Sequence, residues 1–265
     1  NITQGYTVVG ANNFQEQVTA LQKAGLVQQV WDNAANIHSL QPETSTSYNL
    51  GAQFTFAKTF NFNLNGFYNQ INNLINTEQV GIMRNGQQLF SYLNIHRIFT
   101  RGLEMELKCR PFKGFTFSAG YQLLTAKSQD IIDTIKAGHS TVRATGGIRT
   151  AATSDYFGLP NRSRHMGSAM LLYHYRPWGV SATLRAGYRG KYGFLDIDNN
   201  GYIDQYDVFV KGYMLLNVAV QKTLLKEKLT LQLAMDNITN YTDYLMPSQP
   251  GRVISGGLMW QLRKF

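Results

Sequence analysis

The feature that most constrains the fold of this 265-residue chain is an alternation of apolar and polar residues, repeated along most of its length. In the clearest stretch, residues 48–56, the apolar positions are Tyr48, Leu50, Ala52, Phe54 and Phe56. Because a β-strand sends successive side chains to opposite faces, such a stretch has one apolar and one polar face. The pattern predicts nine strands, over residues 46–58, 60–76, 89–110, 115–127, 162–175, 180–191, 211–222, 228–236 and 252–262.

The connections between the predicted strands alternate in length. Tight turns, such as Pro111–Gly114 and Arg176–Gly179, follow the odd-numbered strands, whereas longer polar loops, such as 77–88 and 128–160, follow the even-numbered ones. A bacterial transmembrane β-barrel has short turns at its periplasmic face and long loops outside. We therefore expect an all-β fold, a transmembrane antiparallel β-barrel of the bacterial outer membrane. Its long loops are expected to be extracellular and its C-terminus periplasmic.

Composition is consistent with this fold but does not decide it. No run approaches the roughly 18 apolar residues of a transmembrane helix, and the mean hydropathy of −0.25 suits a soluble β-sandwich as well as a barrel. The single cysteine, Cys109, excludes a disulfide or a cysteine-based metal site within the chain. The formal net charge is +9, but the basic residues are scattered, so we expect no nucleic-acid partner.

The predicted strands do not close a barrel on their own. Nine is an odd number, whereas bacterial single-chain barrels use an even one, and an open edge leaves backbone groups unpaired in lipid. We therefore expect the chain to be the C-terminal part of a larger barrel. Residues 1–45 are expected to form an extracellular loop segment with a short helix over 13–31, bent or broken at Gly25. Residues 46–262 supply the strands and loops, and 263–265 form a tail.

Three segments resemble motifs that occur together in one known family of outer-membrane proteins. Leu40–Ser45 resembles the "L-x-P-E-x-S" that introduces a strand in that family, and Arg101–Glu104 resembles its recurrent "x-G-L-E" strand. Residues 236–252 resemble its closing "D-N-L-x-N-x-x-Y … P-G-R" hairpin. With these motifs the chain resembles the C-terminal region of TonB-dependent outer-membrane receptors. The resemblance implies a barrel of about 22 strands, of which these are the last nine. It also implies an N-terminal plug outside this chain, and energy delivered by the TonB complex.

Residues 196–207 follow the pattern of a calcium-binding loop. Such a loop has oxygen ligands at positions 1, 3, 5, 9 and 12, a glycine at position 6 and a backbone carbonyl ligand at position 7. The ligand positions here are Asp196, Asp198, Asn200, Tyr202, Asp204 and Asp207. Aspartate at the last position has a shorter reach than the usual glutamate, so weaker binding is expected. The loop predicts a structural Ca²⁺ ion that stiffens an extracellular loop; a solvated acidic turn without metal is the alternative.

Four further residues are candidates for contact with an external ligand. His38 precedes the first strand and His96 lies in the outer half of the third, and imidazole ligates haem iron. Tyr241 and Tyr244 lie in the last outer loop. The alternatives are ordinary loop or wall histidines, and tyrosines that pack in a loop or belong to the aromatic girdle at the membrane interface.

Charged residues on the inward faces of the strands are candidates for contact with a plug, or for ion pairs within the lumen wall: Glu104, Glu106, Lys108, Arg185 and Arg189. No catalytic arrangement such as G-x-S-x-G or H-E-x-x-H is present in the sequence, so no enzyme is expected.

The function expected from the resemblance is active import of a scarce, large ligand: haem, a cobalamin or a ferric siderophore. Outer loops would capture the ligand, and TonB would drive the opening of the plug. The expected partners are the missing N-terminal plug and barrel portion, the TonB complex and outer-membrane lipid, with a surface lipoprotein cap left open. A passive porin built from several chains and an outer-membrane adhesin are the alternatives.

Overall fold

The computed structural model describes residues 6–31, 34, 37, 40–57, 59–198, 200–246 and 248–261, without the side chains of Glu78, Ile95 and His96. The chain forms two compact units. The first comprises residues 1–47, 69–99 and 128–130, and the second comprises residues 48–68, 100–127 and 131–265. The leucine at 262 and the predicted tail 263–265 lie outside the described residues.

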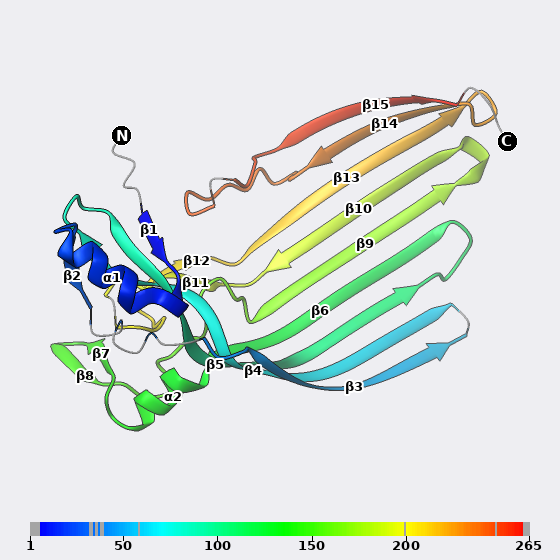
Figure 1. Cartoon of the computed structure of the whole chain (residues 1–265). Helices are drawn as coiled ribbons and strands as arrows, with labels where there is room; N and C mark the ends of the chain where they lie inside the picture. The colour runs from blue at the N-terminus through cyan, green and yellow to red at the C-terminus, as the bar shows by residue number, and fades with distance from the viewer. Residues whose placement is uncertain are drawn as a thin grey trace. The chain divides into compact units, whose positions relative to one another are not determined.

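All nine predicted strands are present. They are β3 (Thr44–Phe56), β4 (Phe60–Met83), β5 (Gln88–Cys109), β6 (Phe115–Ser128), β9 (His165–Tyr175), β10 (Val180–Arg189), β13 (Tyr213–Leu224), β14 (Leu229–Asp236) and β15 (Val253–Trp260). They pair in the order β15-β14-β13-β10-β9-β6-β5-β4, with β3 also paired to β4 (Figure 1). Each of these strands therefore pairs with the long strand that precedes it in the chain, as in an up-and-down barrel. The prediction of an all-β barrel wall is confirmed.

The apolar faces of neighbouring strands coincide. One row of directly paired residues crosses six strands from β6 to β15 and is apolar throughout: Phe117, Leu171, Leu184, Val218, Met235 and Ile254. One residue further along, the paired positions from β6 to β13 are Ser118, Met170, Arg185 and Asn217. The second unit thus has one apolar face and one largely polar face, as the alternation predicts.

The apolar face is exposed. Leu50 of β3 is 84% exposed, Leu233 of β14 is 62% exposed and Leu258 of β15 is 69% exposed. Aromatic side chains flank the band next to the short turns and are exposed as well: Phe56, Phe112, Tyr175, Trp178 and Trp260. An apolar band bordered by aromatic residues is the outer surface of a membrane barrel.

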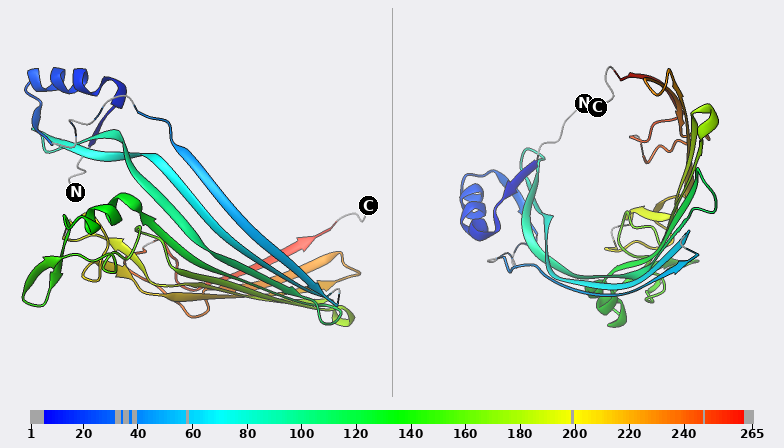
Figure 2. Two further views of the ribbon diagram at one scale, coloured as in Figure 1. Left: turned by 90° about the horizontal axis from the view of Figure 1, so that it is seen from below. Right: turned by 90° about the vertical axis from the view of Figure 1, so that its right-hand side faces the viewer.

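The short turns lie together at one end of the strands of the second unit, and the elements of its long loops lie at the other (Figure 2). Residues 176–178 of the turn between β9 and β10 form a 3₁₀ helix. In the turn between β5 and β6, Gly114 has a φ of +84° and its carbonyl accepts a hydrogen bond of 2.7 Å from the His174 N–H. A Cβ at this position would collide with the His174 carbonyl oxygen, so the turn requires glycine.

Strand β9 explains a break in the predicted alternation. Met166, Met170 and Leu172 do not alternate with polar residues in the sequence. The register places Leu171 opposite Leu184 of β10, so the lipid-facing set is the odd-numbered one. Met166 and Met170 instead line the inner face beside polar residues.

In the first unit, β1 (Tyr6–Val9) leads through a 3₁₀ turn (Ala11–Asn13) into α1 (Phe14–Lys23), which is followed by β2 (Val27–Val30). Gly25, with a φ of +69°, ends the helix: its N–H bonds to the Gln22 carbonyl and the Leu26 N–H to the Leu21 carbonyl. This pair of bonds is a Schellman motif. The predicted break at Gly25 is therefore confirmed, but the prediction of helix beyond it is wrong.

The first unit has its own core. Val9, Phe14, Val18 and Val27 pack with buried residues from the outer parts of β4 and β5, namely Val80, Met83, Leu89 and Leu93. β2 pairs with β4, and β1 pairs in parallel with β5. These contacts extend both long strands, so the prediction of a loop over 77–88 is wrong. Only residues 84–87 form the turn.

The long connections of the second unit also contain regular structure. Between β6 and β9 lie α2 (Gln129–Lys136), β7 (Thr141–Ala144) and β8 (Gly147–Thr150); between β10 and β13 lie β11 (Tyr192–Leu195) and β12 (Val208–Val210). β7 pairs with β8, and β11 with β12. None of the helices in the described part of the chain is long and apolar enough to span a bilayer.

Leu233→Arg tests the assignment of the apolar face. A charge at a lipid-facing position near the middle of the bilayer is expected to destabilise the folded protein by about 2–4 kcal/mol. The measurement is the free energy of unfolding of the whole receptor by denaturant in lipid vesicles, which should be lower in the variant.

Gln232→Arg is the matched control. Gln232 lies on the opposite face, where it accepts a hydrogen bond from Gln221, so an arginine there remains in water. If the two variants lose the same stability, the assignment of the faces is incorrect.

Candidate functional site

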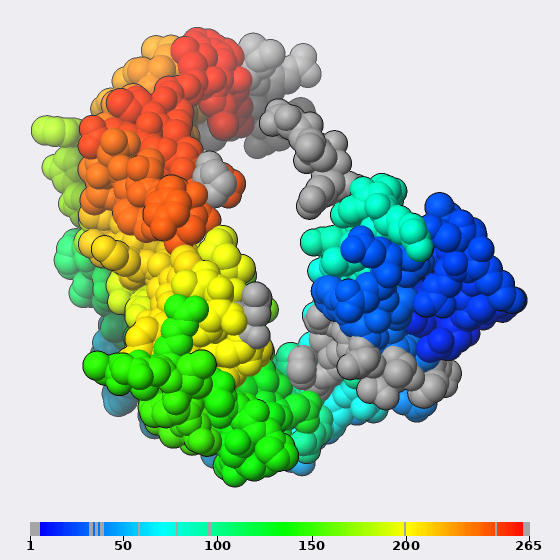
Figure 3. Space-filling model, turned by 90° about the vertical axis from the view of Figure 1, so that its left-hand side faces the viewer, coloured from blue at the N-terminus to red at the C-terminus, as the bar shows by residue number. Residues whose placement is uncertain are grey.

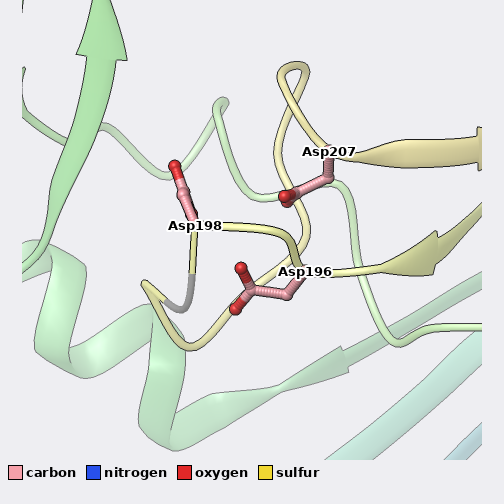
Figure 4. Close-up of side chains that lie close together, drawn as sticks. All are labelled: Asp196, Asp198 and Asp207. Carbon is pink, nitrogen blue, oxygen red and sulfur yellow. The ribbon is translucent and has the colours of Figure 1, made fainter.

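The predicted calcium loop connects β11 to β12, two short antiparallel strands. The carboxylates of Asp196, Asp198 and Asp207 come within 4.8 Å of one another. Asp196 and Asp198 follow β11, whereas Asp207 immediately precedes β12 (Figure 4). The pairing of the two strands therefore brings acidic residues from both ends of the loop together.

Backbone N–H groups hold two of these carboxylates in place. The Gly201 N–H donates to Asp196 Oδ2 at 2.9 Å. The N–H groups of Ile197 and Asp204 donate to the two oxygens of Asp207, at 3.0 and 2.8 Å. Hydrogen bonds to an ionised acceptor are stronger than neutral ones, so the loop backbone fixes the positions of Asp196 and Asp207.

One oxygen of the cluster is left unpaired. Asp196 Oδ1 is buried and has no hydrogen-bond partner among the described residues. A buried anionic oxygen without a partner is unfavourable. A cation held between the three carboxylates would compensate for it, and hard carboxylate oxygens are the ligands that Ca²⁺ takes.

Two other predicted ligands have different contacts. Asp204 is fully buried and accepts hydrogen bonds from Asn200 Nδ2 at 2.9 Å and from the Tyr206 N–H at 2.7 Å. Asn200 Oδ1 accepts a bond of 3.1 Å from the Tyr202 N–H. Asp204 lies outside the group of three carboxylates. In the described structure these two side chains brace the loop.

The electrostatics of the cluster are only partly balanced. Arg143 of β7 lies with its Nε 3.2 Å from Asp198 Oδ2. Burial is the main cause that raises the pKa of Asp207; its backbone hydrogen bonds oppose the rise, and the negative charges of Asp196 and Asp204 add to it. The cluster therefore retains negative charge that one arginine does not neutralise.

The calcium loop also packs against the preceding long loop. Tyr202 donates a hydrogen bond of 2.9 Å to the Thr141 carbonyl, and its ring meets the ring of Tyr156 edge to face. Burial raises the pKa of Tyr202 to about 12. The shared core consists of Ile135, Val142, Ala151, Tyr156 and Tyr202. In Figure 3 the green residues of the first loop lie against the yellow residues of the second.

The two tyrosines of the last loop differ in their surroundings. The ring of Tyr241 stacks on Tyr213 with centroids 4.8 Å apart, and its hydroxyl donates to Asp243 at 3.1 Å. Buried Asn237 donates to the Tyr241 carbonyl at 2.7 Å. Tyr244, in contrast, is 86% exposed. Tyr241 thus packs the loop, and Tyr244 is accessible to a ligand.

The predicted histidines are not placed by the described structure. His38 lies outside the described residues. His96 belongs to β5, but its side chain is not described. Their contact with a ligand stays a prediction.

The inner wall carries amide groups that the sequence analysis did not single out. Two adjoining hollows of about 550 and 740 Å³ lie along it. Glu104 accepts hydrogen bonds from Gln122 at 2.8 Å and from Asn65 at 3.4 Å, and Glu106 accepts one from Asn63 at 3.4 Å. The asparagines of β4 alternate with its apolar residues, and that pattern is the signal that places them on this wall.

Arg189 lies at the outer end of β10. Its guanidinium carbon lies 3.9 Å from the ring centre of Tyr192, and it donates to the Asn161 carbonyl at 2.8 Å and to Ser163 Oγ at 3.2 Å. It holds the bases of two loops together.

The family follows from comparison with known proteins. The family model described as "TonB dependent receptor-like, beta-barrel" matches residues 1–238. The chain belongs to this family, and it corresponds to the C-terminal portion of the receptor barrel. The family is one of outer-membrane receptors and not of enzymes. None of the curated proteins matches the chain in sequence.

Solved structures share the fold. The FrpB iron transporter from Neisseria meningitidis is 16% identical with a TM-score of 0.57, over 83% of this chain and 31% of its own. The ferric-catecholate import receptor Fiu from E. coli K12 is 17% identical with a TM-score of 0.57, over 88% and 30%. The siderophore receptor PirA from Pseudomonas aeruginosa is 15% identical with a TM-score of 0.53, over 82% and 29%. The chain thus spans about a third of the length of these receptors.

An ion pair beside the cluster gives a pH-dependent prediction. Arg149 donates two hydrogen bonds of 2.7 Å to Asp155, and the Ala152 N–H donates one of 2.8 Å. Arg149 first and Ala152 second lower the pKa of Asp155. A carboxyl with a lowered pKa stabilises the fold above its unfolded pKa of about 3.9. That stabilisation is lost as the pH falls through the folded value.

Asp155→Asn is therefore expected to reduce hydrogen-exchange protection of residues 141–155 at pH 7, after correction for intrinsic exchange rates. Below the folded pKa of Asp155, variant and parent should be alike. The amides of β13 and β14 are the internal control. A difference that persists unchanged at low pH would exclude the ion pair as its cause.

Proposed function

We propose that this chain forms the C-terminal wall and outer loops of a receptor that imports a scarce, large ligand across the outer membrane. The family match over residues 1–238 carries the proposal. The sheet supports it with one lipid-facing surface and one polar inner surface. The long loops would face outside and the short turns the periplasm.

Among haem, cobalamins and ferric siderophores, we favour a ferric siderophore. The similar structures include an iron transporter, a ferric-catecholate import receptor and a siderophore receptor. Exposed Tyr244 is the residue of the last loop that we expect to contact the ligand. His38 and His96 remain candidates for haem.

The proposed partners follow from the length of the chain. The solved receptors are about three times as long, so we expect a plug and further strands from the rest of the receptor, and TonB to drive the plug. The amide- and carboxylate-lined inner wall, with Glu104 and Glu106, is the surface that a plug would meet. Whether a surface lipoprotein caps the receptor stays open; the outer loops are where such a cap would bind.

Uptake measurements in cells test this proposal. Cells that carry the whole receptor as their only importer are expected to accumulate radiolabelled ferric siderophore when TonB is present, and to fall to background when TonB is deleted. The reason is that an energised plug, not diffusion, limits entry. Labelled haem and cobalamin identify the ligand class in the same assay.

Each rival function gives a different result. A passive porin would take up the label equally well without TonB. An adhesin would take up none of the three ligands under either condition. Either result contradicts active import.

We further infer that the β11–β12 loop holds a structural Ca²⁺ ion. The inference rests on the three converging carboxylates and on the unpaired buried oxygen of Asp196. Asn200 and the Tyr202 carbonyl complete the proposed ligand set. Asp204 would contribute through its hydrogen bond with Asn200 or through a bridging water, as position 9 of such loops often does. Such an ion would join the end of β11 to the start of β12.

Asp207→Asn is expected to weaken calcium binding to the whole receptor by at least about tenfold, because it removes one of three anionic ligands. Titration calorimetry with Ca²⁺ measures the effect. Asp236→Asn is the control, since it removes the same charge from an exposed residue at the end of β14 and touches neither the cluster nor the loop that packs against it.

The alternative, an acidic turn without a metal ion, predicts a different result in the same titration. If the parent protein binds no Ca²⁺ at millimolar concentration, the loop is an acidic turn balanced by Arg143. If Asp236→Asn weakens binding as much as Asp207→Asn, the ion is held by diffuse charge and not by the cluster.

A further inference from the structure

A groove of about 900 Å³ lies on the second unit, across β3, β4, β5 and β6. Its walls are mostly apolar and come from alternate residues of these strands: Leu50, Leu64, Leu103 and Leu123. Leu50 and Leu103 are exposed. Because these residues belong to the lipid-facing set of each strand, the groove opens on the outside of the barrel wall.

Gly66 keeps this groove open. It occupies a lipid-facing position of β4 between Leu64 and Tyr68 and lines the groove. A Cβ built there would lie 3.5 Å from Leu103 Cδ2 and 3.8 Å from the Leu50 carbonyl oxygen, which are ordinary contacts. A side chain therefore fits at this position without a clash, and its absence leaves the hollow.

Arg101 is the charged residue that lines the groove among the described residues. It is exposed and shares the outer face with Leu103. A charged side chain in contact with lipid is destabilising near the middle of the bilayer and tolerated near the interface, where its long side chain reaches the headgroups. The position of Arg101 along the strand therefore decides whether its guanidinium lies among acyl chains or among lipid headgroups.

Arg101 lies near the outer edge of the apolar band. It precedes Cys109, the last residue of β5, by eight residues. At about 3.3 Å per residue and a tilt near 40°, this places it about 20 Å above the turn, in a band about 25 Å tall. Tyr48 and Tyr68 lie at the same level, each eight residues from the turn between β3 and β4, and both line the groove. Tyrosines at this level are typical of the interface.

From these observations we propose that the groove binds one anionic, phosphate-bearing lipid of the outer leaflet. An acyl chain lies along the leucines where Gly66 leaves space, and Arg101 binds the phosphate at the headgroup level. The groove lies within the lipid-facing band, so a lipid reaches it and a soluble protein partner does not. The site is independent of the imported ligand.

Native mass spectrometry of the whole receptor, released from nanodiscs of equal phosphatidylglycerol and phosphatidylcholine, tests the proposal. The parent protein is expected to retain one phosphatidylglycerol. Arg101→Gln removes a charge-assisted contact and should lower the retained fraction by about tenfold. Gly66→Val fills the groove with a residue that suits a strand and should lower it similarly.

Arg185→Gln is the matched control, because Arg185 lines the inner wall and its loss removes the same charge. It should retain the lipid as the parent does. Equal retention in all four proteins would overturn the site. Equal retention of phosphatidylcholine and phosphatidylglycerol by the parent would overturn the role of charge.

Discussion

Every strand in the wall must make its backbone hydrogen bonds with neighbouring strands, because lipid offers none. The register of this pairing then decides which side chains face the lipid and which face the lumen. The row from Phe117 through Leu184 to Ile254 is apolar only because each pairing is in phase. A slip of one residue in β10, for example, would turn Arg185 toward the acyl chains. The register thus protects both faces of the wall at once.

Outside the bilayer this constraint disappears, and the loops fold by packing on each other. The connection between β6 and β9 shares a core with the connection between β10 and β13 through Tyr156 and Tyr202. In the first unit, α1 and β2 pack on the extensions of β4 and β5 in the same manner. These segments are ordered by ordinary hydrophobic burial, with core side chains such as Phe14 fully buried.

This difference explains what the sequence predicts and what it does not. The nine strands and their faces were predictable because alternation with a period of two is a local signal, as was the end of α1 at Gly25. The strand Val27–Val30 was not, since its conformation depends on pairing with β4. Likewise, spacing placed six oxygen ligands in one loop, but only the fold separates Asp207, which joins the carboxylate cluster, from Asp204, which braces the loop.

The charge of that cluster indicates which kind of cation would suit it. Asp196, Asp198 and Asp207 carry three negative charges when ionised, buried Asp204 adds a fourth close by, and Arg143 supplies one positive charge, so the loop keeps a net negative charge. A divalent ion would compensate more of this charge than a monovalent ion, with the ion pair intact and the buried oxygen of Asp196 given a partner. Arg143 also ties the β7–β8 hairpin to the cluster through Asp198. The same contact would let the ion order both outer loops together.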